Sequence, residues 1–146
     1  MNKILLIITG SIAASRCKEI IALLNINEVK ISCILTKEAK KYVKISDIKK
    51  LLKNRIFTDE DEKKNKMLHI NLSRDNDIIV VCPATANSIA KFANGYGDNL
   101  ASNTLLASNK KILFVPAMNS FMWHNKINQK NVKLLRDSGH EFIGPT

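Results

Sequence analysis

Apolar runs alternate along the chain with segments in which apolar residues recur every three or four positions. The apolar runs, each ended by polar or turn-forming residues, predict strands over 4–9, 30–36, 77–82, 111–115 and 141–143. The helical spacing predicts helices over 12–24, 38–43, 47–52, 87–93, 98–108 and 126–138. This alternation predicts an α/β fold, with a doubly wound sheet of about five parallel strands in a single domain.

Local signals place the ends of several elements. Ser46 and Asp98 are predicted N-caps, because a short polar side chain at the start of a helix accepts from free backbone N–H groups. Residues 55–66 are strongly charged and contain few apolar side chains, so we expect an exposed loop there.

Two of the predicted strands end in nearly the same residues. One reaches a Pro-Ala pair at Pro83 and an asparagine at Asn87; the other reaches Pro-Ala at Pro116 and Asn119. The two prolines are 33 positions apart, about one strand–helix–strand unit. The carboxyl ends of parallel strands meet at one edge of a sheet, where ligands of open α/β sheets bind. Function is therefore predicted at this edge.

These two loops have two interpretations. The amide and main-chain groups of Ala84, Thr85 and Asn87 offer donors and acceptors for the edge of a flat heterocycle. Asn119 would then bind a substrate carboxylate, with Met118 in an apolar wall. In the other interpretation, the two asparagines only cap the helices that follow, and the methionine packs in the core.

The turn after the first strand contains Gly10 and Ser11. Backbone N–H groups at a helix start attract phosphate, and a glycine lets the ligand approach. The full Gly-x-Gly-x-x-Gly fingerprint is missing, and the second strand ends in Thr36 where a dinucleotide fold usually places an acid. These departures favour a mononucleotide, with Ser11 and Thr36 as donors to its phosphate or sugar. The alternative is a tight turn with a capping serine.

Composition excludes several classes of function. The formal net charge is +10, but the lysines are scattered without an arginine cluster or aromatic platform, so no nucleic-acid partner is expected. Such a surface still attracts phosphorylated ligands. No apolar run approaches the ~20 residues that span a bilayer, so we expect a soluble, cytoplasmic protein without a membrane partner. Cys17, Cys33 and Cys82 lack metal-binding spacing and are expected to be reduced, buried thiols with no bound metal.

His69 directly precedes the strand that leads to Pro83. Its imidazole can titrate near neutral pH, so it could shuttle a proton or stabilise a developing charge. The alternative is a partly buried histidine with a structural role. His124 and His140, in polar turns, are weaker candidates.

Four segments together resemble one known family. They are Gly10–Ala14; His69–Leu72; Pro83–Lys91 with Asn94, Gly95 and Asp98–Leu100; and Pro116–Asn119 with Met122 and Trp123. In order and spacing the chain resembles the homo-oligomeric flavin-containing cysteine decarboxylases, and among them the phosphopantothenoylcysteine decarboxylases.

The resemblance implies a Rossmann-like, FMN-binding flavoprotein subunit that forms a homotrimer or a dodecamer of trimers, with flavin sites at subunit contacts. His69 matches the family's essential histidine, and Ala117, Met118 and Asn119 match its substrate-binding motif. The phosphate would lie near the first turn and the ring near the 83–88 loop. The implied cofactor-binding residues are Gly10, Ser11, Ile12, Thr36, Pro83, Ala84, Thr85, Asn87 and Ser88.

The activity implied by the resemblance is FMN-dependent decarboxylation of (R)-4′-phosphopantothenoyl-L-cysteine to 4′-phosphopantetheine in coenzyme A biosynthesis. The substrate class is a phosphorylated, cysteine-containing small molecule. Two alternatives are an FMN-binding regulatory or interaction subunit without full catalysis, and a decarboxylase of peptidyl cysteine.

The family continues beyond the Gly144-Pro145 pair into a flexible substrate clamp that carries a cysteine, whereas the sequence ends at Thr146. We therefore expect residues 1–146 to be a flavoprotein domain truncated after its last strand. Its reaction is expected to be impaired or to stop at the enethiol, since the clamp cysteine takes part in the final reduction.

Overall fold

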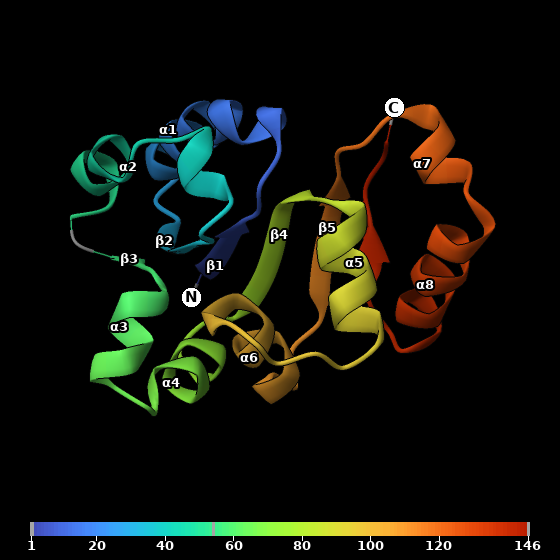
Figure 1. The fold of residues 1–146 in the computed structure, drawn as a ribbon. Helices are drawn as coiled ribbons and strands as arrows, with labels where there is room; N and C mark the ends of the chain where they lie inside the picture. The colour runs from blue at the N-terminus through green and yellow to red at the C-terminus, as the bar shows by residue number, and fades with distance from the viewer. Residues whose placement is uncertain (1, 54, 146) are drawn as a thin grey trace.

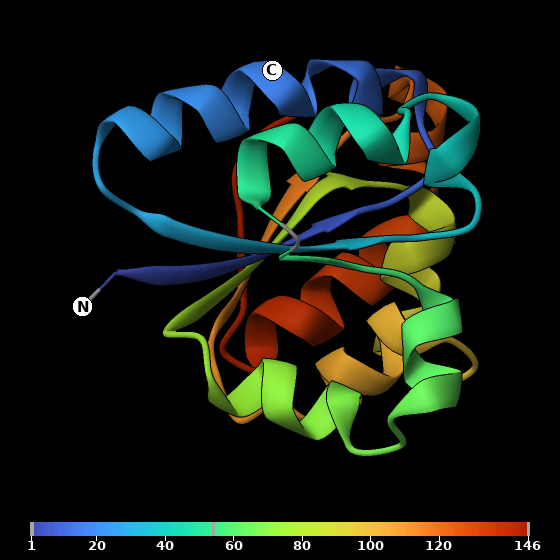
Figure 2. The same cartoon turned by 90° about the vertical axis from the view of Figure 1, so that its left-hand side faces the viewer.

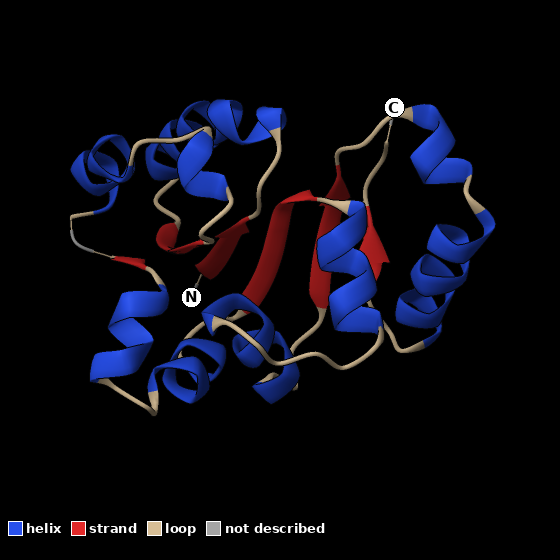
Figure 3. Cartoon of the chain, viewed as in Figure 1, coloured by secondary structure: helices blue, strands red, loops and turns tan. Residues whose placement is uncertain are grey.

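The computed structural model describes residues 2–53 and 55–145. Within them, six parallel strands form one sheet in the order β3-β2-β1-β4-β5-β6 (Figures 1 and 3). The strands are β1 Lys3–Ile8, β2 Lys30–Leu35, β3 Ile56–Phe57, β4 Ile78–Ala84, β5 Ile112–Pro116 and β6 Glu141–Phe142. The predicted doubly wound α/β fold is confirmed, and the described sheet has β3 in addition to the strands expected. Thr146, where truncation was expected, lies outside the described residues.

Helices cover both faces of the sheet (Figure 2). The α-helices are α1 Cys17–Ile26, α2 Ile45–Leu52, α3 Asp59–Lys64, α4 Leu68–Arg74, α5 Ala86–Ala93, α6 Leu100–Ala107, α7 Ser120–His124 and α8 Lys126–Asp137. Two short 3₁₀ helices, η1 Ile12–Arg16 and η2 Ala39–Lys41, follow β1 and β2. None of the helices in the described ranges is long and apolar enough to cross a bilayer.

The sheet separates two cores, because successive side chains of a strand point to opposite faces. On β1, Leu6 and Ile8 pack with helices α1 and α2, whereas Leu5 and Ile7 pack with α4, α5, α6 and α8. All four side chains are almost completely buried. The unbroken apolar run of β1 is thus explained by burial on both faces.

The expectation of an exposed loop over 55–66 is wrong. Ile56 is buried in strand β3, which pairs with β2, and the acidic segment after it forms α3. The Asp61 carboxylate accepts from Thr58 N at 2.8 Å, and Asp59 accepts from Leu100 N, at the start of α6, at 3.0 Å. The acidic residues therefore order the segment, because they satisfy backbone donors that helix starts leave free.

Both predicted N-caps are also wrong. Helix α2 begins after Lys44, so Ser46 lies inside it. Asn99, rather than Asp98, caps α6: its Oδ1 accepts from Ser102 N at 2.8 Å. Neighbouring polar residues compete for the cap position, and the direction in which the chain enters the helix decides between them.

Candidate functional site

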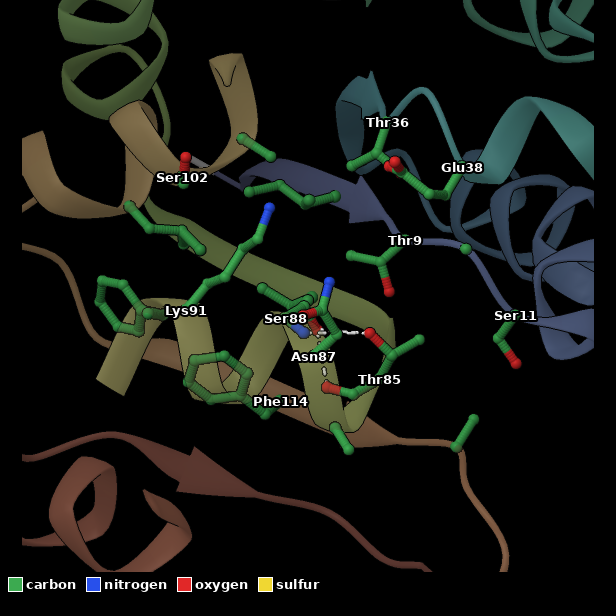
Figure 4. Close-up of a pocket in the computed structure, with 18 of the residues that line it drawn as sticks. Thr9, Ser11, Thr36, Glu38, Thr85, Asn87, Ser88, Lys91, Ser102 and Phe114 are labelled. Carbon is green, nitrogen blue, oxygen red and sulfur yellow. Dashed lines mark hydrogen bonds between the residues drawn. The ribbon is translucent and has the colours of Figure 1, made fainter. Parts of the chain in front are cut away.

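A pocket of about 330 Å³ opens at the carboxyl edge of the sheet, within the usual size range of small-molecule sites (Figure 4). It lies where the chain order of the strands reverses, between β1 and β4, which is the usual ligand crevice of an open α/β sheet. Its apolar lining includes the side chains of Ile7, Val81, Phe92, Leu105 and Phe114. Polar lining residues follow β1, β2 and β4 and begin α6.

Hydroxyl groups gather at the β1 and β2 end of the pocket. Ser11 Oγ accepts from Ala13 N at 3.2 Å, and Thr36 Oγ1 accepts from Ala39 N at 3.3 Å. Each hydroxyl is thereby oriented as an acceptor toward the backbone and keeps its proton free to donate to a ligand. The arrangement provides two neutral donors at one end of the pocket.

Gly10 lines the same end of the pocket, and local packing explains why this position is a glycine. A Cβ built on Gly10 would lie 2.4 Å from Glu38 Cβ and 3.1 Å from the Glu38 carbonyl carbon. The backbone after β2 therefore approaches the turn after β1 too closely for any side chain. Glu38, a carboxylate to which no sequence motif pointed, also lines the pocket.

The loop after β4 is stabilised by its own hydroxyl groups. Thr85 caps α5: its Oγ1 accepts from Ser88 N at 3.1 Å, and Ser88 Oγ donates to Thr85 O at 2.9 Å (Figure 4). The alternative that Asn87 caps this helix is wrong. Asn87 is exposed on the pocket wall and makes no side-chain hydrogen bond to the described residues, so its amide is available to a ligand.

Pro83 and Ala84 lie in and at the end of β4, buried, and do not line the pocket. Their backbone carbonyl groups instead hold neighbouring parts of the pocket in place. The Thr9 hydroxyl donates to the Pro83 carbonyl, which joins the ends of β1 and β4, and Ala117 N donates to Ala84 O at 3.0 Å. The last bond places the two Pro-Ala loops side by side, as their similar sequences suggested.

The loop after β5 contributes Ala117 and Met118 to the pocket lining, but not Asn119. Asn119 Oδ1 accepts from Met122 N at 2.9 Å and caps α7. The predicted cap is therefore present at this residue, and it does not exclude a contact between the side chain and a substrate. Its Nδ2 stays available, because the cap uses only the oxygen.

Two predicted residues lie elsewhere. Ile12 follows the pocket turn but is 79% exposed and does not line the cavity. His69 lies on α4, a helix absent from the expected elements, and is not among the pocket residues either. Its Nδ1 is 3.3 Å from Glu62 Oε2, and its side chain is 27% exposed. Within one chain, the predicted catalytic histidine and the pocket are therefore separate.

Lys91, which ends one of the segments that resemble the family, is a further pocket residue. It lies on α5, and Figure 4 shows its amine reaching into the cavity. Lys91 Nζ is 3.0 Å from Asp98 Oδ2, and this hydrogen bond lowers the pKa of the Asp98 carboxyl. Ser102 Oγ also donates to Asp98, at 3.2 Å. Among the pocket residues that the structure describes, Lys91 is the only basic one.

The three cysteines are free thiols, as expected, but only two of them are fully buried. Cys17 and Cys33 are buried and Cys82 is partly buried, and all three are free thiols. Burial raises the pKa of Cys33 well above its ordinary value. Contact with Cys82 and burial do the same to the pKa of Cys17, which donates to the Cys82 carbonyl at 3.3 Å. In the described part of the chain, no three metal-ligating side chains cluster together.

Comparison of the sequence with known proteins shows the family to which the chain belongs. The sequence profile of the Flavoprotein family matches residues 1–146. The chain belongs to the Flavoprotein family. This flavoprotein is 31% identical over 148 residues to a probable phosphopantothenoylcysteine decarboxylase of Streptococcus mutans, covering 99% of the chain and 83% of the relative. It is 35% identical over 140 residues to the bifunctional coenzyme A biosynthesis protein CoaBC of Haemophilus influenzae, covering 94% of the chain and 35% of that relative.

Solved structures give the same grouping. The flavoprotein superposes on the FMN-dependent cysteine decarboxylase SpaF with a TM-score of 0.93 at 30% identity, over 100% of the chain and 85% of SpaF. It superposes on the peptidyl-cysteine decarboxylase EpiD with a TM-score of 0.87 at 32% identity, over 100% and 88% of the two chains. The predicted resemblance to flavin-containing cysteine decarboxylases is confirmed. The chain spans about a third of the length of the bifunctional relative.

Proposed function

We propose that this flavoprotein is an FMN-dependent carbon–carbon lyase that decarboxylates (R)-4′-phosphopantothenoyl-L-cysteine. The observation that carries the proposal is the pocket at the β1–β4 switch point, with hydroxyl donors at one end and apolar side chains beneath. The relatives include a probable phosphopantothenoylcysteine decarboxylase of comparable length. The pocket and the relatives together support FMN-dependent decarboxylation, and in this proposal the loop after β5 is the substrate loop.

The donor set fits an FMN molecule. Ser11 and Thr36 can donate to a phosphate, and Gly10 leaves room beside them. The apolar lining, with Phe114 fully buried in it, suits a planar ring, and the Asn87 amide offers both a donor and an acceptor to the ring's polar edge. Pro83, Ala84 and Ile12 would act through the backbone.

Bound FMN would supply the oxidising power that converts the substrate's cysteinyl thiol into a thioaldehyde with the loss of two electrons. The carboxylate then leaves as CO₂, because the thiocarbonyl accepts its electron pair and becomes an enethiol. In this proposal Asn119 Nδ2 binds the carboxylate, Ala117 and Met118 line its approach, and His69 holds or moves a proton. Return of the same two electrons from the reduced flavin would convert the enethiol into 4′-phosphopantetheine and complete the reaction.

His69 lies outside the pocket of its own chain, which favours a site completed at a subunit contact. We therefore keep the proposal of a homotrimer, or of a larger assembly of trimers. Native mass spectrometry of the FMN-loaded protein measures the subunit number, and a monomer with full activity would refute this part. A cytoplasmic location stays a prediction from the sequence.

The decisive experiment incubates the FMN-loaded protein with phosphopantothenoylcysteine and identifies the products by mass. Loss of CO₂ alone indicates 4′-phosphopantetheine, and loss of CO₂ with two further hydrogens indicates the enethiol. A colourless protein that takes up no added FMN would refute the cofactor assignment. His69→Asn is expected to retain FMN and to release no CO₂; a variant with normal activity removes His69 from the mechanism.

Two other candidates remain distinguishable in the same assay. Similarity to EpiD favours a peptide that ends in cysteine as the substrate, and such a peptide is tested in parallel. FMN binding without CO₂ release from either substrate would instead favour a regulatory or interaction subunit.

A further inference from the structure

Three helices bring a carboxylate, an imidazole and an amide together outside the pocket. Glu62 lies on α3, His69 on α4 and Asn103 on α6. Glu62 Oε2 is 3.3 Å from His69 Nδ1, and Asn103 Nδ2 lies 3.2 Å and 3.5 Å from the two Glu62 carboxylate oxygens. The side chains of His69 and Glu62 are only 27% and 21% exposed. The carboxylate is therefore held between an amide and an imidazole in a largely desolvated place.

The two edges of the His69 ring differ. Nδ1 is buried and makes no well-angled hydrogen bond to the described residues, and the Glu62 carboxylate is the charged group beside it. The exposure of the side chain therefore belongs to the rest of the ring, and Nε2 lies on the edge opposite Nδ1. Because Nδ1 is buried, Nε2 is the ring nitrogen left for a reactant to reach.

The orientation of the Asn103 amide follows from packing. A Cβ built on Gly97 would lie 2.5 Å from Asn103 Oδ1, so the amide oxygen lies against the Gly97 backbone. The Nδ2 group consequently faces Glu62 and can only donate to it. This donor fixes the carboxylate beside His69 without competing for its proton.

We propose that Glu62 is a positioning residue for His69, which keeps the proton of the neutral imidazole on Nδ1 and makes Nε2 the reacting nitrogen. A carboxylate only accepts hydrogen bonds, so a bare Nδ1 facing it would place two lone pairs against each other. A second proton taken up by the ring then resides on Nε2, and Glu62 compensates the charge of the imidazolium. The proposal rests on the role of His69 proposed above.

The test determines which ring nitrogen of His69 carries the proton. Protein labelled with ¹⁵N-histidine and loaded with FMN is examined by NMR at a pH where the imidazole is neutral, and His69→Asn assigns the His69 signals. The wild-type ¹⁵N shifts are expected to show the proton mainly on Nδ1. In Glu62→Gln the population is expected to move toward the Nε2–H form. A wild-type ring that carries its proton mainly on Nε2 overturns the proposal.

Glu60 supplies a matched control on the same helix. Its side chain is 68% exposed and pairs with Lys63 at 3.3 Å, and it takes no part in the proposed site. Glu60→Gln removes the same charge from α3 and is expected to leave the His69 tautomer and the rate unchanged. An equal shift in both variants would show that the general charge of the helix, rather than the contact with Glu62, sets the tautomer.

Kinetic measurements distinguish a positioning role of Glu62 from a role in folding. Glu62→Gln is expected to lower kcat for CO₂ release by about tenfold to hundredfold, as outer partners of functional histidines do, with KM and bound FMN within about twofold. Asn103→Ala frees the carboxylate and is expected to give a smaller loss of the same kind. If Glu62→Gln does not fold, the wild-type tautomer and Asn103→Ala still decide. Unchanged kcat in a folded Glu62→Gln refutes the positioning role, whereas an inactive wild type refutes the proposed function instead.

Discussion

Replacing Gly10 by alanine tests whether the close approach of two turns builds the phosphate end of the pocket. The added Cβ would lie 2.4 Å from Glu38 Cβ, about 1 Å short of ordinary van der Waals contact. Glu38 Cβ cannot turn away, because it is attached to the backbone that leads from Thr36 into η2. Overpacking costs about 1–3 kcal/mol, and the loss of glycine entropy in the unfolded chain returns about 0.4–1, so we expect about 1–2 kcal/mol of destabilisation.

Because relief of this overlap moves the turn that carries Thr36, we also expect the Kd for FMN to rise at least about tenfold, which corresponds to about 1.4 kcal/mol. Urea unfolding measures the stability, and quenching of flavin fluorescence measures the affinity. Gly95→Ala is the control: φ is +74° there and nothing lies within 4 Å of a Cβ, so it loses about 1 kcal/mol to backbone strain without a change in affinity. Wild-type stability and FMN affinity in Gly10→Ala would refute the reasoning.

Three further variants test other parts of the site. Asn119→Ser keeps a capping oxygen but loses the amide, so unfolding free energy should stay within about 0.5 kcal/mol while CO₂ release falls at least about tenfold; normal release would leave Asn119 only as a cap. Burial lowers the pKa of His140 below its ordinary 6.5, so the unfolded chain takes up a proton first and stability falls as pH drops through that value. His140→Asn keeps an acceptor for Ile112 N, which His140 Nδ1 binds at 3.1 Å, and should lose less stability in urea unfolding below pH 6.5; an unchanged pH dependence contradicts this assignment. FMN is an anion and Lys91 is the only basic residue among the described pocket residues, so Lys91→Met should raise the Kd for FMN about tenfold and Lys91→Arg much less. Wild-type affinity in the methionine variant would mean that the ammonium serves only Asp98.

The candidate site was predictable where residues adjacent in sequence stay adjacent in space. Gly10, Ser11 and Thr85 follow strand ends directly, so locating the strands located them at the carboxyl edge. The pairing of the two Pro-Ala loops was also predictable from the sequence, because parallel strands one crossover apart in sequence often lie next to each other in the sheet. The bond from Ala117 N to Ala84 O is the structural form of that pattern.

Other parts of the site depended on contacts between distant segments. The acidic stretch before His69 has the composition of a loop, and the Thr58–Asp61 capping box was the one local signal that a helix begins there. Asp59 in this stretch accepts from Leu100 N, which lies 41 residues further along the chain. The Glu62–His69–Asn103 cluster arises only when α3, α4 and α6 meet, so no spacing in the sequence revealed it.

The sequence by itself determined the order of strands and helices, the parallel sheet, the family and the edge at which the pocket opens. These follow from hydrophobic periodicity and from motifs whose residues are neighbours along the backbone. Tertiary structure alone decided that Asn119 caps a helix, that Gly10 is needed because Glu38 packs against it, and that His69 faces Glu62 away from the pocket. Such contacts depend on how separate elements pack, and packing is set by the whole core rather than by any one segment.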